Sequence, residues 1–71
     1  MENIVFYFGN NADTMIATKA LKDAGILAKM IPKPSVVSSG ANICLSLNSS
    51  VELQAKTVLT SAGVALGGII T

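Results

Sequence analysis

Cys44 is the only residue of this chain with a strongly nucleophilic side chain. A thiol of this kind can hold a sulfur or selenium atom as a persulfide or perselenide. That role needs an accessible thiol whose pKa is lowered by a nearby cation or helix N-terminus. Lys33 is the nearest lysine, and the loop between the two residues could bring it close. The opposite interpretation is a small apolar residue packed on a sheet, against the chain itself or a second copy. The residues alone leave both interpretations open.

A second candidate site is the segment that precedes the strand of Cys44. Its hydroxyls and backbone N–H groups could cradle an anion, with Lys33 supplying positive charge. The alternative is a plain connection, in which prolines end one strand and Ser-Gly turns into the next. At roughly ten residues, the segment is longer than the usual hairpin loop of two to five, which favours a ligand loop. Its candidate residues are Pro32, Lys33, Pro34, Ser35, Ser38, Ser39, Gly40 and Ala41.

The remaining composition excludes most other chemistry. The chain has no histidine, and all five of its basic residues are lysines. It therefore lacks the commonest general base and metal ligand, and a single cysteine excludes a cysteine-cluster metal site. A net charge of +1 gives no electrostatic footprint for nucleic acid. Three of the four acids, Asp13, Asp23 and Glu52, fall at expected helix ends and form no acid–base pair. We expect a protein that is not an enzyme, with no cofactor, metal or nucleic-acid partner.

The length of 71 residues predicts one domain, residues 1–71. Such a chain buries only about 60% of the surface that its unfolded form exposes. The N-terminus carries Glu2 rather than a basic region followed by an apolar run. The uncharged tail, residues 57–71, is shorter than the roughly 20 residues needed to cross a bilayer. We therefore expect a cytoplasmic protein with no membrane partner.

Hydrophobic patterning predicts four strands, at residues 4–8, 26–31, 41–48 and 64–70, and two helices, at 12–24 and from 49 to about 62. Asn10 is placed to cap the first helix, and Gly25 to end it. In the second helix, Ser49 and Glu52 have the spacing of a capping box, and Gly63 follows the last turn.

The element order β-α-β-β-α-β predicts an α+β, ferredoxin-like fold: a four-stranded antiparallel sheet with two helices on one face. The Ala-Gly-Ile at residues 24–26 returns as Ala-Gly-Val at residues 62–64, as two similar halves would require. The open sheet face should carry Cys44 and Ser46, with Val5 and Tyr7 in one register of the first strand. A half-apolar open face of this kind is often closed by a second copy. We therefore expect a homodimer through this face.

Three stretches together resemble a known family: Leu-Lys-Asp-Ala-Gly-Ile at 21–26, Met-Ile-Pro-Lys-Pro at 30–34, and Ser-Ser-Gly at 38–40. They are similar to small prokaryotic proteins called putative selenium/sulfur carrier protein-like. The resemblance covers nearly the whole chain and implies a carrier of sulfur or selenium that is loaded by a donor enzyme such as a cysteine desulfurase. Where the family has an arginine after the second proline, this chain has Ser35. Where the family has its Cys-Gly pair, this chain has Ala41 and Asn42.

Two hypotheses follow from that difference. In the first, the protein is a non-enzymatic thiol carrier that uses Cys44 in place of the family's loop cysteine, with residues 32–41 as the working surface. In the alternative, it is a homo-oligomeric binding or regulatory module with no thiol chemistry, and Cys44 only packs. The accessibility of Cys44 in the folded protein separates the two hypotheses.

Overall fold

The structure is a computed structural model that describes residues 3–37 and 40–70. Its element order is β-α-β-β-α-β, as predicted. The elements are β1 (Asn3–Phe8), α1 (Asn11–Asp23), β2 (Ala28–Pro32), β3 (Ile43–Asn48), a 3₁₀ turn (Ser49–Val51), α2 (Glu52–Ser61) and β4 (Leu66–Ile70).

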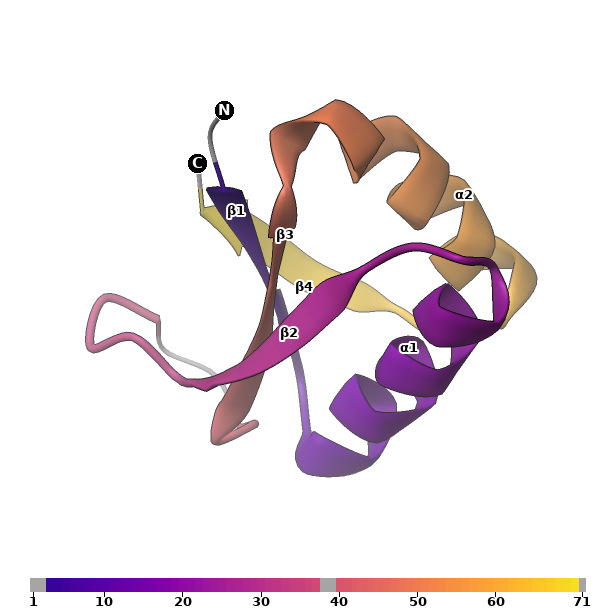
Figure 1. The fold of residues 1–71 in the computed structure, drawn as a ribbon. Coiled ribbons are helices and arrows are strands. Elements are labelled where there is room, and N and C mark those ends of the chain that lie inside the picture. Colours follow the sequence, from indigo (N-terminus) through magenta and orange to yellow (C-terminus); the bar gives the residue numbers. More distant parts are fainter. Residues whose placement is uncertain (1–2, 38–39, 71) are drawn as a thin grey trace.

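The four strands form one antiparallel sheet in the order β2-β3-β1-β4. Both helices lie on the same side of the sheet, and the β2–β3 loop reaches away from them on the other side (Figure 1). The predicted ferredoxin-like α+β fold is therefore confirmed. No helix in residues 3–37 and 40–70 has the length and apolar character needed to cross a membrane.

The core lies between the sheet and the two helices. Alternate residues of β1 and β3 face the helices, as the period-2 pattern of these strands predicts. Removing this apolar surface from water is the main stabilising contribution to so small a fold. The buried cluster comprises Ile4, Phe6, Phe8, Ala17, Leu21, Ile26, Leu45, Leu47, Ala55, Leu59 and Val64.

The two helices end in the same way, which confirms the similarity of the two halves. Gly25 and Gly63 have positive φ angles of 78° and 75°, a conformation that glycine adopts without steric cost. In each case, the next residue donates its N–H back to the last turn: Ile26 to the Leu21 carbonyl at 2.9 Å and Val64 to the Leu59 carbonyl at 3.0 Å. These are Schellman-type ends. Ile26 and Val64 are both buried, but each precedes the strand that follows its helix. β2 and β4 therefore begin at residues 28 and 66 rather than at the predicted residues 26 and 64.

Pro32 is the last residue of β2, one residue beyond the predicted strand 26–31, and it pairs with Ile43. Since β2 is an edge strand, a residue without an N–H is tolerated there.

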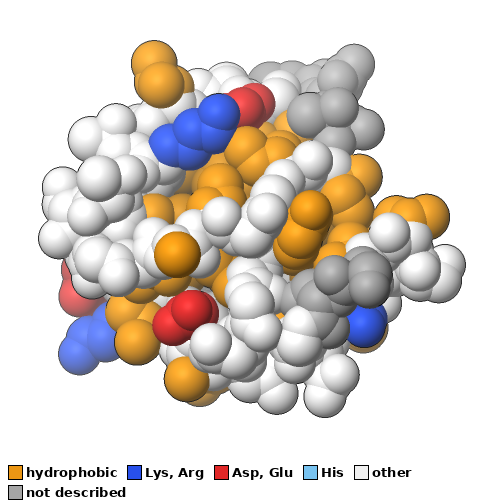
Figure 2. Space-filling view, turned by 180° about the vertical axis from the view of Figure 1, so that it is seen from behind, with side chains coloured by type: hydrophobic (Ala, Val, Ile, Leu, Met, Phe, Trp, Pro, Cys, Tyr) orange, Lys and Arg blue, Asp and Glu red, His pale blue; other side chains and the backbone are white. Residues whose placement is uncertain are grey.

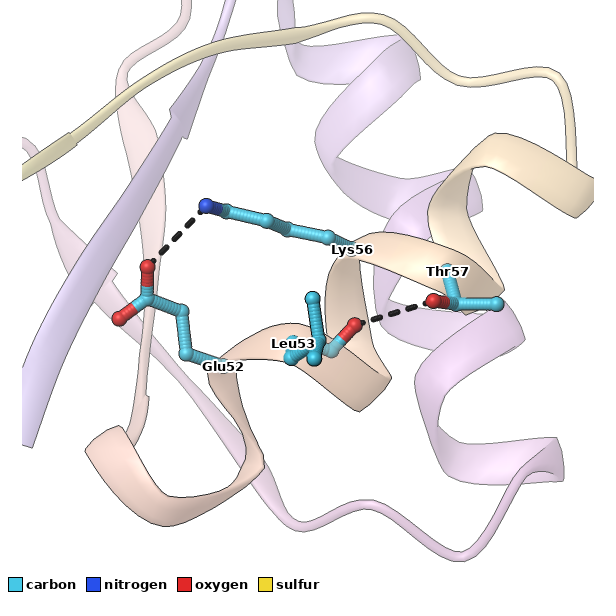
Figure 3. Close-up of polar contacts among 4 residues, drawn as sticks. All are labelled: Glu52, Leu53, Lys56 and Thr57. Atoms are coloured by element: carbon cyan, nitrogen blue, oxygen red, sulfur yellow. Dashed lines mark hydrogen bonds and ion pairs between the residues drawn. The ribbon is translucent and has the colours of Figure 1, made fainter.

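The predicted capping box is wrong. A 3₁₀ turn separates β3 from α2, so the residue before the helix is Val51, which offers no side-chain acceptor. Asn48, the residue before the 3₁₀ turn, caps that turn instead. Its side-chain oxygen accepts the Ser50 N–H at 2.9 Å. Glu52 pairs with Lys56 one turn later, at 3.1 Å (Figure 3).

Candidate functional site

Cys44 lies on the sheet face opposite the helices, where it pairs with Ile31 of β2. Its neighbour Leu45 faces the helices and belongs to the main core. Cys44 is nevertheless 0% exposed. Burial raises the pKa of its thiol above the ordinary value of 9.0, and the positive charge of Lys33 partly opposes that rise. At neutral pH the thiol is therefore protonated as well as covered, which is the state of an unreactive cysteine.

The described residues of the β2–β3 loop, 33–37 and 40–42, extend from the sheet on the side away from the helices (Figure 1). Two of its apolar residues are buried, Val37 at 6% and Ala41 at 0%. Neither they nor Cys44 belong to the cluster beneath the helices. These three residues are therefore buried apart from the cluster beneath the helices. Because the helices lie on the other face of the sheet, we infer that the loop contributes to the cover over Cys44.

Hydrogen bonds hold both ends of this loop in place. The Lys33 N–H donates to the Asn42 carbonyl at 3.0 Å, and the Val37 N–H donates to the Pro34 carbonyl at 3.0 Å in a tight turn. The Asn42 N–H donates in turn to the side-chain oxygen of Asn11 at 2.8 Å. The end of the loop is thereby fixed to the first residue of α1.

Gly40 closes the same end of the loop against the end of β1. A Cβ atom at this position would collide with the backbone carbonyl oxygen of Gly9. The loop and the residue that follows β1 therefore approach each other closely, and only glycine permits this contact.

The Asn11 contact gives a direct test of this geometry. Replacing Asn11 with Ala removes an acceptor from a backbone N–H and is expected to lower the free energy of unfolding by about 1 kcal/mol. Asn11→Asp keeps an acceptor oxygen at the helix N-terminus, where a negative charge is favourable, and should retain wild-type stability. Urea denaturation of both variants measures the effect. Equal losses in the two variants would contradict the assigned role of the side-chain oxygen.

The predicted loop residues fall into distinct environments. Pro32 is exposed on β2, Lys33 and Pro34 are half-buried, Ser35 and Gly40 are exposed, and Ala41 is buried. Ser38 and Ser39 lie outside the described residues, so the anion cradle that includes them remains a prediction. Within the described ranges, no three histidine, cysteine or acidic side chains are grouped so that they could hold a metal ion.

Sequence reasoning missed two features of this site. In the sequence, Asn11 is distinguished only as the residue next to the predicted helix cap, Asn10. Its hydrogen-bond partner, Asn42, lies 31 residues away along the chain. Val36 and Val37 are adjacent apolar residues in a segment rich in serine and proline. In the structure Val37 is buried, whereas Val36 is 78% exposed. The Val37 side chain therefore anchors the loop, and the Val36 side chain projects into solvent.

Comparison with known proteins adds one finding to this geometry. A family model described as "Putative Se/S carrier protein-like" matches residues 3–71. Neither the curated proteins nor the solved structures contain a match to the chain. Because the family match extends over nearly the whole length, the chain belongs to the Se/S carrier protein-like family.

Proposed function

We propose that this protein is a cytoplasmic, non-enzymatic binding module of its family, one that works through the β2–β3 loop without thiol chemistry. The observation that carries the proposal is the complete burial of Cys44. A carrier thiol must meet the sulfur atom of its donor, and a side chain with no exposed surface does not. The family's loop cysteine and arginine, by the resemblance described above, correspond here to Ala41 and Ser35.

Val36 supports a binding role for this loop. Its side chain is 78% exposed, beside the buried Val37 that anchors the loop. Ser35, which precedes it, is also exposed. A loop that holds an apolar side chain in water is suited to contact a partner protein. Burial of that side chain in the partner would stabilise the complex through the hydrophobic effect.

Photo-crosslinking in the native cell, followed by mass spectrometry, tests this proposal. We compare the wild-type protein with Val36→Asp and Cys44→Ala. The control is Leu53→Asp, because Leu53 on α2 is also 78% exposed. The binding role predicts that crosslinked partners disappear for Val36→Asp and persist for the other two variants. Partners that are lost with Cys44→Ala and kept with Val36→Asp would contradict it.

A thiol carrier is the second candidate, and the position of Lys33 favours it, since its charge lowers the pKa of Cys44 against the effect of burial. In this role the loop opens and the Cys44 thiolate attacks the outer sulfur of a donor enzyme's persulfide. A new S–S bond forms on Cys44, the donor's S–S bond breaks, and the donor cysteine leaves as a thiolate. This mechanism requires an open state of the loop, which the binding role does not.

A further inference from the structure

We propose that two copies of this chain pair along β4, antiparallel to each other, so that two four-stranded sheets become one of eight strands. The interface lies at the sheet edge formed by Leu66–Ile70. The inference is independent of the loop and of Cys44.

The two edges of the sheet differ in how they are protected against pairing. An edge strand offers unpaired N–H and C=O groups to any other strand, and proteins commonly block such edges with lysine or proline. The β2 edge has both, Lys29 and Pro32. The β4 edge, Leu-Gly-Gly-Ile-Ile, has neither. Pairing is therefore open on one side of the sheet and blocked on the other.

The charge pattern indicates a second copy as the occupant. Residues 57–71 contain no charged side chain. Two copies of β4 itself therefore meet without like charges opposite each other, an arrangement that would destabilise the strand pair. Antiparallel pairing about a two-fold axis is isologous, and it continues the antiparallel pattern of every existing pair in the sheet.

The Tyr7 ring lies close against Gly67 and Gly68 of β4. A Cβ atom at Gly68 would collide with the Tyr7 ring, and one at Gly67 would lie 3.0 Å from the Tyr7 carbonyl oxygen. The register of β4 shifts between the partners of Tyr7 and Phe8, so the irregularity falls in the first half of the strand. Bulges themselves discourage edge pairing. We therefore expect the new hydrogen bonds at Gly68–Ile70, where the ladder with β1 is regular.

A five-residue strand alone is too small for a stable dimer, so the interface must extend beyond it. Typical interfaces bury about 800 Å² per partner, roughly a fifth of the 4275 Å² surface of this chain. Beside β4 runs a groove of about 200 Å³, lined by Lys56, Leu59, Thr60, Val64 and Leu66. β4 lies on the far side of Figure 1, and Figure 2, seen from that side, shows hydrophobic side chains gathered in the middle of the face. The partner's β4 flank is expected to cover this groove.

Two threonines of α2 provide a matched test. Thr60 lines the groove, whereas Thr57 does not. Each is exposed, and each donates its hydroxyl to the carbonyl four residues earlier, Thr60 to Lys56 at 2.9 Å and Thr57 to Leu53 at 3.1 Å. Figure 3 shows the contact of Thr57. Thr60→Lys should raise the dimer dissociation constant at least about tenfold, because it brings two added positive charges into the interface. Thr57→Lys should change it less than about twofold.

Sedimentation equilibrium of the wild-type chain and these variants measures the dissociation constants. Hydrogen exchange supplies the second readout: the amides within Gly68–Ile70 that point away from β1 should gain protection as the protein concentration rises through the dissociation constant. A chain that stays monomeric up to millimolar concentration would overturn the proposal, as would equal weakening by the two threonine variants. Ile31→Lys probes the open sheet face, where the sequence predicts a homodimer. A dimer broken by Ile31→Lys and untouched by Thr60→Lys would also overturn the β4 interface.

Discussion

Cys44 of the folded protein is expected to react with iodoacetamide at least about 100-fold more slowly than Cys44 of the denatured chain. The thiol has no exposed surface, so the reagent reaches it only when the loop opens. An opening that costs about 3 kcal/mol leaves the thiol accessible in roughly one molecule in a hundred. Intact mass spectrometry over a time course, with and without urea, measures the two rates. Labelling of the native protein at the rate of the denatured chain would refute the burial.

The substitution of Asn11 connects this slow labelling to the contact that holds the loop. Asn11→Ala removes the acceptor of the Asn42 N–H. It should speed the labelling of Cys44 several-fold, the factor that a loss of about 1 kcal/mol in loop stability gives.

The raised pKa of the Cys44 thiol makes the stability of the folded protein depend on pH. The folded state holds the Cys44 proton to higher pH than the unfolded state, so the contribution of this thiol to stability is constant below 9.0 and is lost as the pH rises past that value. Cys44→Ala should lack this portion of the alkaline loss.

Gly40→Ala is expected to lower the free energy of unfolding by about 1–3 kcal/mol, the usual cost of forcing an extra methyl group into a filled space. The methyl group would collide with the backbone carbonyl oxygen of Gly9. A backbone atom cannot rotate aside as a side chain can, so either the loop or the end of β1 must move. Urea denaturation measures the loss. Iodoacetamide labelling of Cys44 should become faster in the same variant, since the loop is then less firmly closed.

Gly9→Ala is the matched control, because it adds the same methyl group on the other side of the same contact. Nothing lies within 4 Å of a Cβ atom at Gly9. The variant should therefore be neutral or slightly more stable than the wild type, since alanine restricts the unfolded chain. If both variants lost stability equally, the loss would reflect a general intolerance of alanine in this region rather than the Gly40–Gly9 contact.

The fold was predictable because local patterns and the topology agree. The alternation of Ile43, Leu45 and Leu47 correctly places Cys44 on the opposite sheet face, and Gly25 and Gly63 mark the helix ends that the structure confirms. The capping box failed because two local acceptors competed. Asn48 accepts the N–H of Ser50, and the 3₁₀ turn Ser49–Val51 removes Ser49 from the position before the helix.

The cover over Cys44 could not be predicted from the same patterns. Alternation identifies the face of a sheet but not what lies on it. The position of the loop rests on contacts that join residues far apart in the sequence, Asn42 with Asn11 and Gly40 with Gly9, and its buried residues are Val37 and Ala41. Met15 shows the converse limit: this apolar residue of α1 is 55% exposed, whereas its polar neighbour Thr14 is buried.

Intact mass spectrometry after incubation with a cysteine desulfurase and cysteine is the most direct test of the claim that Cys44 does no thiol chemistry. The protein is measured before and after reduction, with Cys44→Ala as the blank. The buried thiol predicts an unchanged mass for the wild-type chain. An added sulfur atom that reduction removes, and that Cys44→Ala never acquires, would contradict the claim and make this protein a sulfur carrier whose loop opens to its donor.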